Sequence, residues 1–167
     1  FYHFAFLIPT GSLDAAIAFL KSKAISLLLY KESEIIYFNN GTAIYFYDQD
    51  VNVVEFIERP LLNYTTDDEF SMNSIAKVNE IGLAVSNPSK TARRLMNEFG
   101  INPIQNAPMK EDFCWLGDHN GAIIVSKEGR HWLPTQIPGS FNDFNITYLD
   151  QGVAYKLSFE KDAIFTE

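Results

Sequence analysis

Short stretches in which apolar and polar residues alternate are the main pattern of this chain. Successive side chains of a β-strand point to opposite faces of a sheet, so alternation predicts half-buried strands. Aromatic residues make up 14% of the chain, and they concentrate in these stretches, as is typical of strands. The predicted strands include residues 1–8, 35–38, 43–47, 113–116 and 144–149.

Two other segments have the i, i+3, i+4, i+7 spacing of a helix with one buried face. The first follows Ser12, a preferred N-cap residue, and the second follows Asn87 and Pro88 and stops at Gly100. Their apolar positions are Leu13, Ala16, Ile17 and Leu20 in the first helix, and Ala92, Leu95, Met96 and Phe99 in the second.

The order of elements occurs twice along the chain. The strand at residues 2–8 aligns with residues 79–85 at a shift of 77, which brings position 3 onto position 80. Asn120-Gly121 predicts a hairpin turn in the second copy, and residues 143–149 would be its last strand. The sequence therefore predicts an α+β protein with two βαβββ modules, at residues 1–60 and 78–150. A linker at 61–77 joins them, and residues 151–167 form a C-terminal strand or tail.

One carboxylate lies inside an apolar strand and requires compensation. Alternation places Glu55 on the same face as Val53 and Ile57, where an ionised group needs a hydrogen-bonded partner, a cation or a metal. His3 lies in a comparable strand. The two can supply two ligands to a divalent ion, or form a hydrogen-bonded pair without metal. Glu80, at the repeat position of His3, adds a third ligand or is the exposed start of a strand.

The strand with His3, the Ala-rich helix and the hairpin at residues 45–56 together resemble one module of the vicinal oxygen chelate superfamily. This superfamily includes glyoxalases, extradiol dioxygenases and bleomycin-resistance proteins. The resemblance implies mixed sheets curled into a cup, and a divalent ion (Fe, Mn, Ni, Co, Zn or Mg) bound by His3 and Glu55, with Glu80 from the repeat as a further ligand or base. Glu55 and Glu80 would also be the catalytic residues.

The implied activity is that of a lyase, isomerase or ring-cleavage dioxygenase acting on a small molecule with vicinal oxygens. An alternative is a metal-free, bleomycin-resistance-like protein that sequesters an aromatic drug or metabolite. A third is a structural domain that dimerises by exchanging modules, and a homodimer is compatible with each of these. Metal content after purification without chelator would separate the first two.

The sequence departs from the family pattern at two places. Val51 stands where the family turn has Gly, so the hairpin turn needs a β-branched residue at positive φ or a different shape. The chain also starts within a strand and without Met, which suggests that an N-terminal module is missing. An extradiol dioxygenase would need a second His from such a module, because His119 and His131 are not at ligand positions.

Five further residues are expected to line a substrate pocket, with aromatic walls and one guanidinium for a flat or anionic molecule. For the aromatic residues the alternative is ordinary core packing, and for Arg130 it is a solvated turn. They are Tyr45, Tyr47, Trp115, Arg130 and Trp132. With an ordinary His3 pKa near ~6.5, metal binding would weaken as pH falls through about 6.

Charge and cysteine content restrict the class of protein. The net charge is −8, from 13 basic and 21 acidic residues, without a basic cluster, which argues against nucleic-acid binding. No apolar run approaches the ~20 residues of a membrane-spanning helix. The single cysteine, Cys114, fits a reducing, cytoplasmic compartment and is expected to be an inert core thiol.

Overall fold

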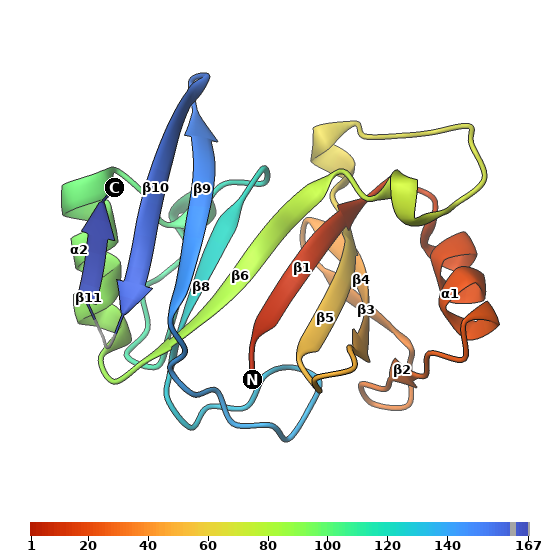
Figure 1. Ribbon diagram of the computed structural model, residues 1–167, viewed down its shortest axis with the longest axis horizontal. Helices are drawn as coiled ribbons and strands as arrows, with labels where there is room; N and C mark the ends of the chain where they lie inside the picture. Colours follow the sequence, from red (N-terminus) through yellow and green to blue (C-terminus); the bar gives the residue numbers. More distant parts are fainter. Residues whose placement is uncertain (161–162, 167) are drawn as a thin grey trace. The chain divides into compact units, whose positions relative to one another are not determined.

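Strands dominate the described residues of the computed structural model, which are 1–160 and 163–166 (Figure 1). The helices are α1 (Leu13–Ser22) and α2 (Pro88–Phe99), with three 3-10 turns, η1 (Pro60–Leu62), η2 (Met72–Ser74) and η3 (Ile104–Asn106). The strands are β1 (His3–Ile8), β2 (Leu27–Leu28), β3 (Ile35–Phe38), β4 (Gly41–Tyr47), β5 (Val53–Glu58), β6 (Lys77–Val85), β7 (Phe113–Gly117), β8 (Ala122–Lys127), β9 (Phe144–Asp150), β10 (Val153–Glu160) and β11 (Ala163–Thr166). No helix of this described part combines the length and apolarity required to cross a membrane.

The chain forms two compact units, and the division between them falls within β6. The first unit consists of Phe1–Ile81 together with His131–Ile137. The second consists of Gly82–Arg130 and Pro138–Glu167.

The sheet of the first unit is mixed. Its strand order is β2-β4-β5-β1-β6, and β3 pairs with β4 beside this path. Strand β1 is parallel to β5 and antiparallel to β6, while β4 is antiparallel to β5. The predicted α+β class with mixed sheets is confirmed.

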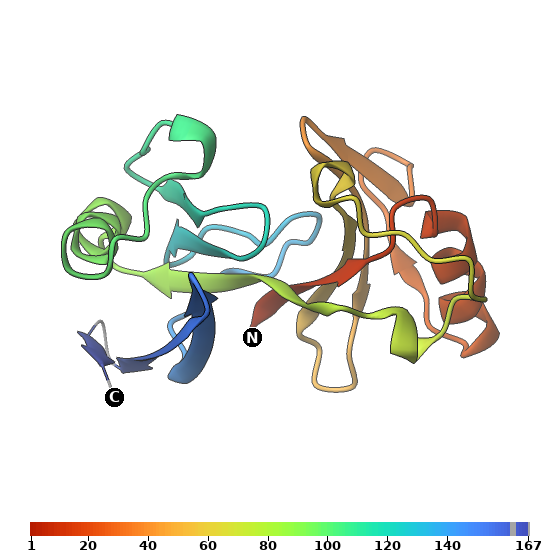
Figure 2. The ribbon, with the colours of Figure 1, turned by 90° about the horizontal axis from the view of Figure 1, so that it is seen from above.

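Helix α1 covers one face of this sheet (Figure 2). Every second residue of β4 and β5 packs against it, including Ile44, Phe46, Val54 and Phe56. The intervening residues, among them Glu55, therefore lie on the opposite face. Strand alternation thus places the apolar core on one face of the sheet and Glu55 on the other.

The N-terminus of α1 is capped by a distant carboxylate. Ser12 precedes the helix as expected, but its hydroxyl donates to the carbonyl of Pro9 and does not cap. The backbone N–H of Leu13 instead donates to Oε1 of Glu58 at 2.8 Å. Glu58 is buried at the end of β5, so it ties the helix to the sheet.

Replacing Glu58 by Ala is expected to lower the free energy of unfolding by about 1–2 kcal/mol, because a buried helix N–H loses its acceptor. Urea unfolding measures this change. Glu58→Gln keeps an acceptor oxygen and should lose less. Equal losses in the two variants would show that the hydrogen bond is not the stabilising interaction.

The turn between β4 and β5 fixes the start of β1. Val51 has φ of 65°, so the strained turn expected from the sequence is present. The side chain of Asp48 accepts from the backbone N–H of Asn52 at 2.8 Å and from its amide at 2.8 Å. The Asn52 side chain in turn accepts from the backbone N–H of Tyr2 at 2.9 Å. The turn therefore holds the residue that precedes His3.

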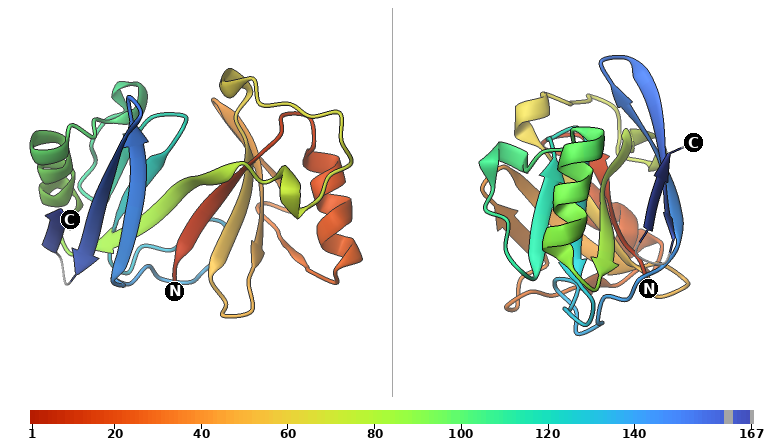
Figure 3. Two further views of the ribbon diagram at one scale, coloured as in Figure 1. Left: turned by 45° about the horizontal axis from the view of Figure 1, so that its top comes forward. Right: turned by 90° about the vertical axis from the view of Figure 1, so that its left-hand side faces the viewer.

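In the second unit, α2 lies against β7 and β8 (Figure 3). It begins as predicted, because Asn87 accepts from the backbone N–H of Lys90 at 3.0 Å and Pro88 is the first helical residue. It ends at Gly100, whose φ is 68°. Strand β8 lies between β6 and β7.

The predicted strand at residues 143–149 is present, but it belongs to a separate sheet. Residues 144–150 form β9 as a strand, but it pairs with β10 in a separate sheet with the order β11-β10-β9. Gln151 and Gly152, with φ of 48° and 82°, form a tight turn between β9 and β10. Such a turn favours a local hairpin, in which β9 pairs with β10.

Candidate metal centre

Four residues form a row across four neighbouring strands on the face opposite α1. Tyr45 of β4 is opposite Glu55 of β5, Glu55 is beside Ala5 of β1, and Ala5 is opposite Glu80 of β6. Ala5 is fully buried, and its small side chain separates the two carboxylates. His3 lies two residues before Ala5 and so points to the same face.

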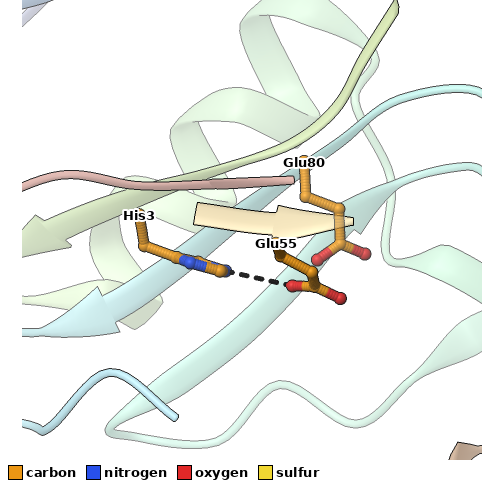
Figure 4. Close-up of side chains that lie close together, drawn as sticks. All are labelled: His3, Glu55 and Glu80. Atoms are coloured by element: carbon orange, nitrogen blue, oxygen red, sulfur yellow. Dashed lines mark ion pairs between the residues drawn. The ribbon is translucent and has the colours of Figure 1, made fainter. Parts of the chain in front are cut away.

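His3, Glu55 and Glu80 meet on this face (Figure 4). His3 Nε2 is 3.5 Å from Glu55 Oε2, and one candidate ligand atom from each residue lies within 4.8 Å of the others. All three residues are buried, with exposures of 5%, 2% and 5%. The structure therefore brings together the three residues expected from the sequence, and all belong to the first unit.

The ring of His3 is oriented by a backbone carbonyl. Nδ1 is 3.2 Å from the carbonyl oxygen of Val53, which can only accept, so the proton of the neutral ring is on Nδ1. The lone pair of Nε2 is then free on the side of Glu55, the arrangement found in metal-ligating histidines. Burial lowers the pKa of His3 to about 4. The expectation of an ordinary His3 pKa is therefore wrong, because it ignored the loss of hydration.

Glu55 has the opposite shift. Burial, and then the negative charge of Glu80, raise its pKa well above the ordinary value. The Tyr45 hydroxyl donates a hydrogen bond to Glu55, which together with the charge of Arg59 opposes this rise without cancelling it. The pKa of Tyr45 is itself raised, first by burial and then by the charge of Glu55. Tyr45 is therefore a hydrogen-bond donor to a carboxylate that binds protons strongly.

Arg59 is a member of the site that the sequence analysis missed. Its side chain is 2% exposed, and its guanidinium donates to Glu80 and, at 3.1 Å, to the side chain of Asn79. It approaches the backbone at Gly41, where a Cβ atom would lie 3.3 Å from Nη1 and 2.8 Å from the Glu58 carbonyl. Glycine at this position leaves room for the guanidinium. A signal was present, because Arg59 continues the odd-numbered face of β5 that carries Glu55.

Two of the five predicted pocket residues contact the cluster. The His3 ring lies 5.4 Å from the Trp132 ring and 6.2 Å from the Tyr45 ring, between centroids. Tyr47 is half-buried at the end of β4, where it is opposite Val53.

The other two predicted pocket residues, Trp115 and Arg130, belong to the second unit. Arg130 lies 3.6 Å from Asp112 and over the ring of Phe113, at 4.7 Å from its centroid. Cys114, on β7, is buried, and burial raises its pKa, in agreement with an inert core thiol.

Comparison with known proteins shows a similarity in fold. No family model matches the chain, and no curated protein matches it significantly. Among solved structures, the chain is similar to a "putative dioxygenase" from Bacillus subtilis subsp. subtilis str. 168, with a TM-score of 0.59 and 14% identity. The match covers 98% of this chain but 60% of the Bacillus protein. At this identity the likeness shows a dioxygenase-like fold.

Proposed function

We propose that the chain is part of a metal-dependent enzyme of the vicinal oxygen chelate superfamily, acting on a small organic molecule with vicinal oxygens. The observation that supports this most is the buried group of His3, Glu55 and Glu80, with candidate ligand atoms within 4.8 Å of one another. One imidazole and two carboxylates suit hard or borderline divalent ions such as Mn, Fe, Co, Ni, Zn or Mg.

The spacing of the side chains is compatible with such an ion. Two ligands on one ion, with bonds of about 2.1 Å, can be at most ~4.2 Å apart. His3 Nε2 and Glu55 Oε2, at 3.5 Å, already meet this limit. Glu80, whose candidate ligand atom lies within 4.8 Å of the other two, would have to move slightly closer to meet this limit. Its ion pair with Arg59 compensates one of the two carboxylate charges.

The residues of the site have different roles in the proposed catalysis. A bound divalent ion would supply Lewis acidity toward the substrate oxygens. Glu55 and Glu80 are the carboxylates that would ligate the ion or accept a proton from the substrate. Tyr45 holds the Glu55 carboxylate through its hydroxyl, and Arg59 balances the charge of Glu80.

A titration with Mn²⁺, followed by electron paramagnetic resonance of the free ion, tests the proposal. The protein should bind one Mn²⁺ per chain, and His3→Ala should weaken binding at least about 10-fold. His119→Ala is the matched control, because it removes a histidine of the second unit. Equal affinity in the wild type and His3→Ala would place any bound ion elsewhere.

A metal-free binding protein is the second candidate, and Arg59 is the observation that favours it. Its guanidinium already provides Glu80 with a cation, and a proton on Glu55 would leave the cluster neutral without an ion. The protein would then sequester an aromatic molecule against Tyr45 and Trp132. Protein purified without chelator and free of divalent ions after Mn²⁺ and Zn²⁺ challenge would support this candidate.

Metal affinity is expected to rise with pH because Glu55 must lose its proton before it can ligate. Its pKa is raised, so this dependence extends above the ordinary carboxyl range. His3, with a pKa of about 4, is already neutral there and contributes nothing near pH 6, contrary to the sequence expectation. Calorimetry in buffers of different ionisation enthalpy should show about one proton released per ion. Binding without proton release would contradict this assignment.

A further inference from the structure

The Trp132 ring lies beside the candidate metal centre, and its indole N–H is a buried donor. The side chain is 3% exposed, and its ring lies 5.4 Å from the ring of His3. Within residues 1–160 and 163–166, Nε1 has no hydrogen-bond partner. Buried N–H groups are almost always partnered in native proteins, since an unpartnered one loses its hydration without compensation. The missing partner is therefore informative.

The backbone around Trp132 is held by its own hydrogen bonds. Its N–H donates to the carbonyl of Ile137 at 3.0 Å, and its carbonyl accepts from the backbone N–H and the hydroxyl of Thr135 at 2.7 and 2.8 Å. The Thr135 hydroxyl also accepts from the N–H of Ile137 at 3.0 Å. The backbone N–H and carbonyl of Trp132 thus have partners within the turn, whereas its indole N–H has none.

We propose that the Trp132 indole N–H is a specificity-determining donor, which hydrogen-bonds an anionic oxygen of the molecule bound at His3, Glu55 and Glu80. An indole N–H can donate but not accept, so its partner must bring a lone pair. The hydroxyl of Tyr45 is already used by Glu55, which leaves Trp132 as the free donor among the rings that contact His3.

The chemistry of the site defines the ligand class. A neutral donor in a buried site interacts most strongly with an oxygen that carries negative charge. The ligand is therefore a small anion with vicinal oxygens, such as oxalate, an enediolate or a catecholate, rather than a neutral diol. This inference rests on the proposed metal-dependent function.

Nuclear magnetic resonance of the Zn²⁺-loaded protein, titrated with oxalate, provides the first test. The chain contains two tryptophans, Trp115 and Trp132, so Trp115→Phe assigns the two indole N–H signals. Oxalate should move the Trp132 signal downfield, as a new hydrogen bond to an anion requires. An unmoved Trp132 signal, while calorimetry shows that oxalate binds, would overturn the inference and leave the proposed function intact.

The second test compares affinities. Trp132→Phe keeps an aromatic ring beside His3 but lacks the donor. It should bind Zn²⁺ as the wild type does, and it should bind oxalate at least about 10-fold more weakly, the usual effect of losing a hydrogen bond to a charged group. Equal oxalate affinities would overturn the inference. Failure of the wild type to bind Zn²⁺ would overturn both the inference and the proposed function.

Discussion

Replacing Glu55 by Gln is expected to reduce divalent-metal affinity by more than ~100-fold, because even residues that only support a metal ligand are worth 10–100-fold. The substitution keeps the shape of the side chain and removes its negative charge. It also leaves Tyr45 with an acceptor oxygen. Calorimetric titration with Mn²⁺ or Zn²⁺ measures the effect, and wild-type affinity in this variant would exclude Glu55 as a ligand.

In the absence of metal, the same substitution should stabilise the protein at higher pH. The pKa of Glu55 is raised in the folded state, so above an unfolded pKa of ~4.5 the folded state binds more protons than the unfolded state. Stability contributed by this group is present at low pH and declines as pH rises toward the folded pKa. Gln does not titrate. With chelator present, the stability of Glu55→Gln should therefore not show this fall with rising pH.

Urea unfolding with chelator, at about pH 5 and about pH 8, isolates this contribution as a difference between the two proteins. The difference is needed because His3 acts in the other direction. Its pKa is lowered to about 4, so its contribution is lost as pH falls from ~6.5 toward that value. Parallel pH profiles for the wild type and Glu55→Gln would show that Glu55 titrates normally.

Arg59→Met is expected to destabilise the metal-free protein by about 3–5 kcal/mol, since breaking a buried ion pair leaves one charge uncompensated. Arg59 and Glu80 are 2% and 5% exposed, and the guanidinium is the cation that contacts this carboxylate. A divalent ion should restore much of the loss by supplying the missing positive charge. Denaturant unfolding with chelator and with excess Mn²⁺ measures both changes.

The matched control is the double variant Arg59→Met with Glu80→Gln. It removes the carboxylate charge together with the guanidinium, so it should recover most of the stability in chelator and gain little from Mn²⁺. An Arg59→Met protein as stable as the wild type would mean that Glu80 is hydrated or neutral. A double variant as unstable as the single one would attribute the loss to packing of the arginine stem.

The sequence could predict those parts of the candidate site that depend on the alternation of side chains along a strand. Alternation placed Glu55 on the face opposite the helix-covered core, and the repeat shift brought Glu80 to the position of His3. The alternation rule holds because a strand fixes the side-chain direction of each of its residues. Trp132 was named for its aromatic character, but its unpartnered N–H needed a structure to be seen.

Three features were not predicted, because they depend on the reach of long side chains or on which strands pair. Alternation places Arg59, just beyond β5, on the face of Glu55, but it does not show that the guanidinium reaches Glu80. Glu58 replaces Ser12 as the cap of α1 because the end of β5 comes close to the start of the helix. Strand β9 was recognised from the sequence, but its place in a separate sheet with β10 was not.

Crystals grown with Zn²⁺ and examined by anomalous diffraction test the central claim most directly. The account predicts a single strong peak on the face of the first unit opposite α1, about 2.0–2.2 Å from His3 Nε2 and from one carboxylate oxygen each of Glu55 and Glu80. Arg59 should then be displaced from the ligating oxygen of Glu80. A Zn²⁺ ion bound elsewhere, with His3 still beside a metal-free Glu55, would contradict the account.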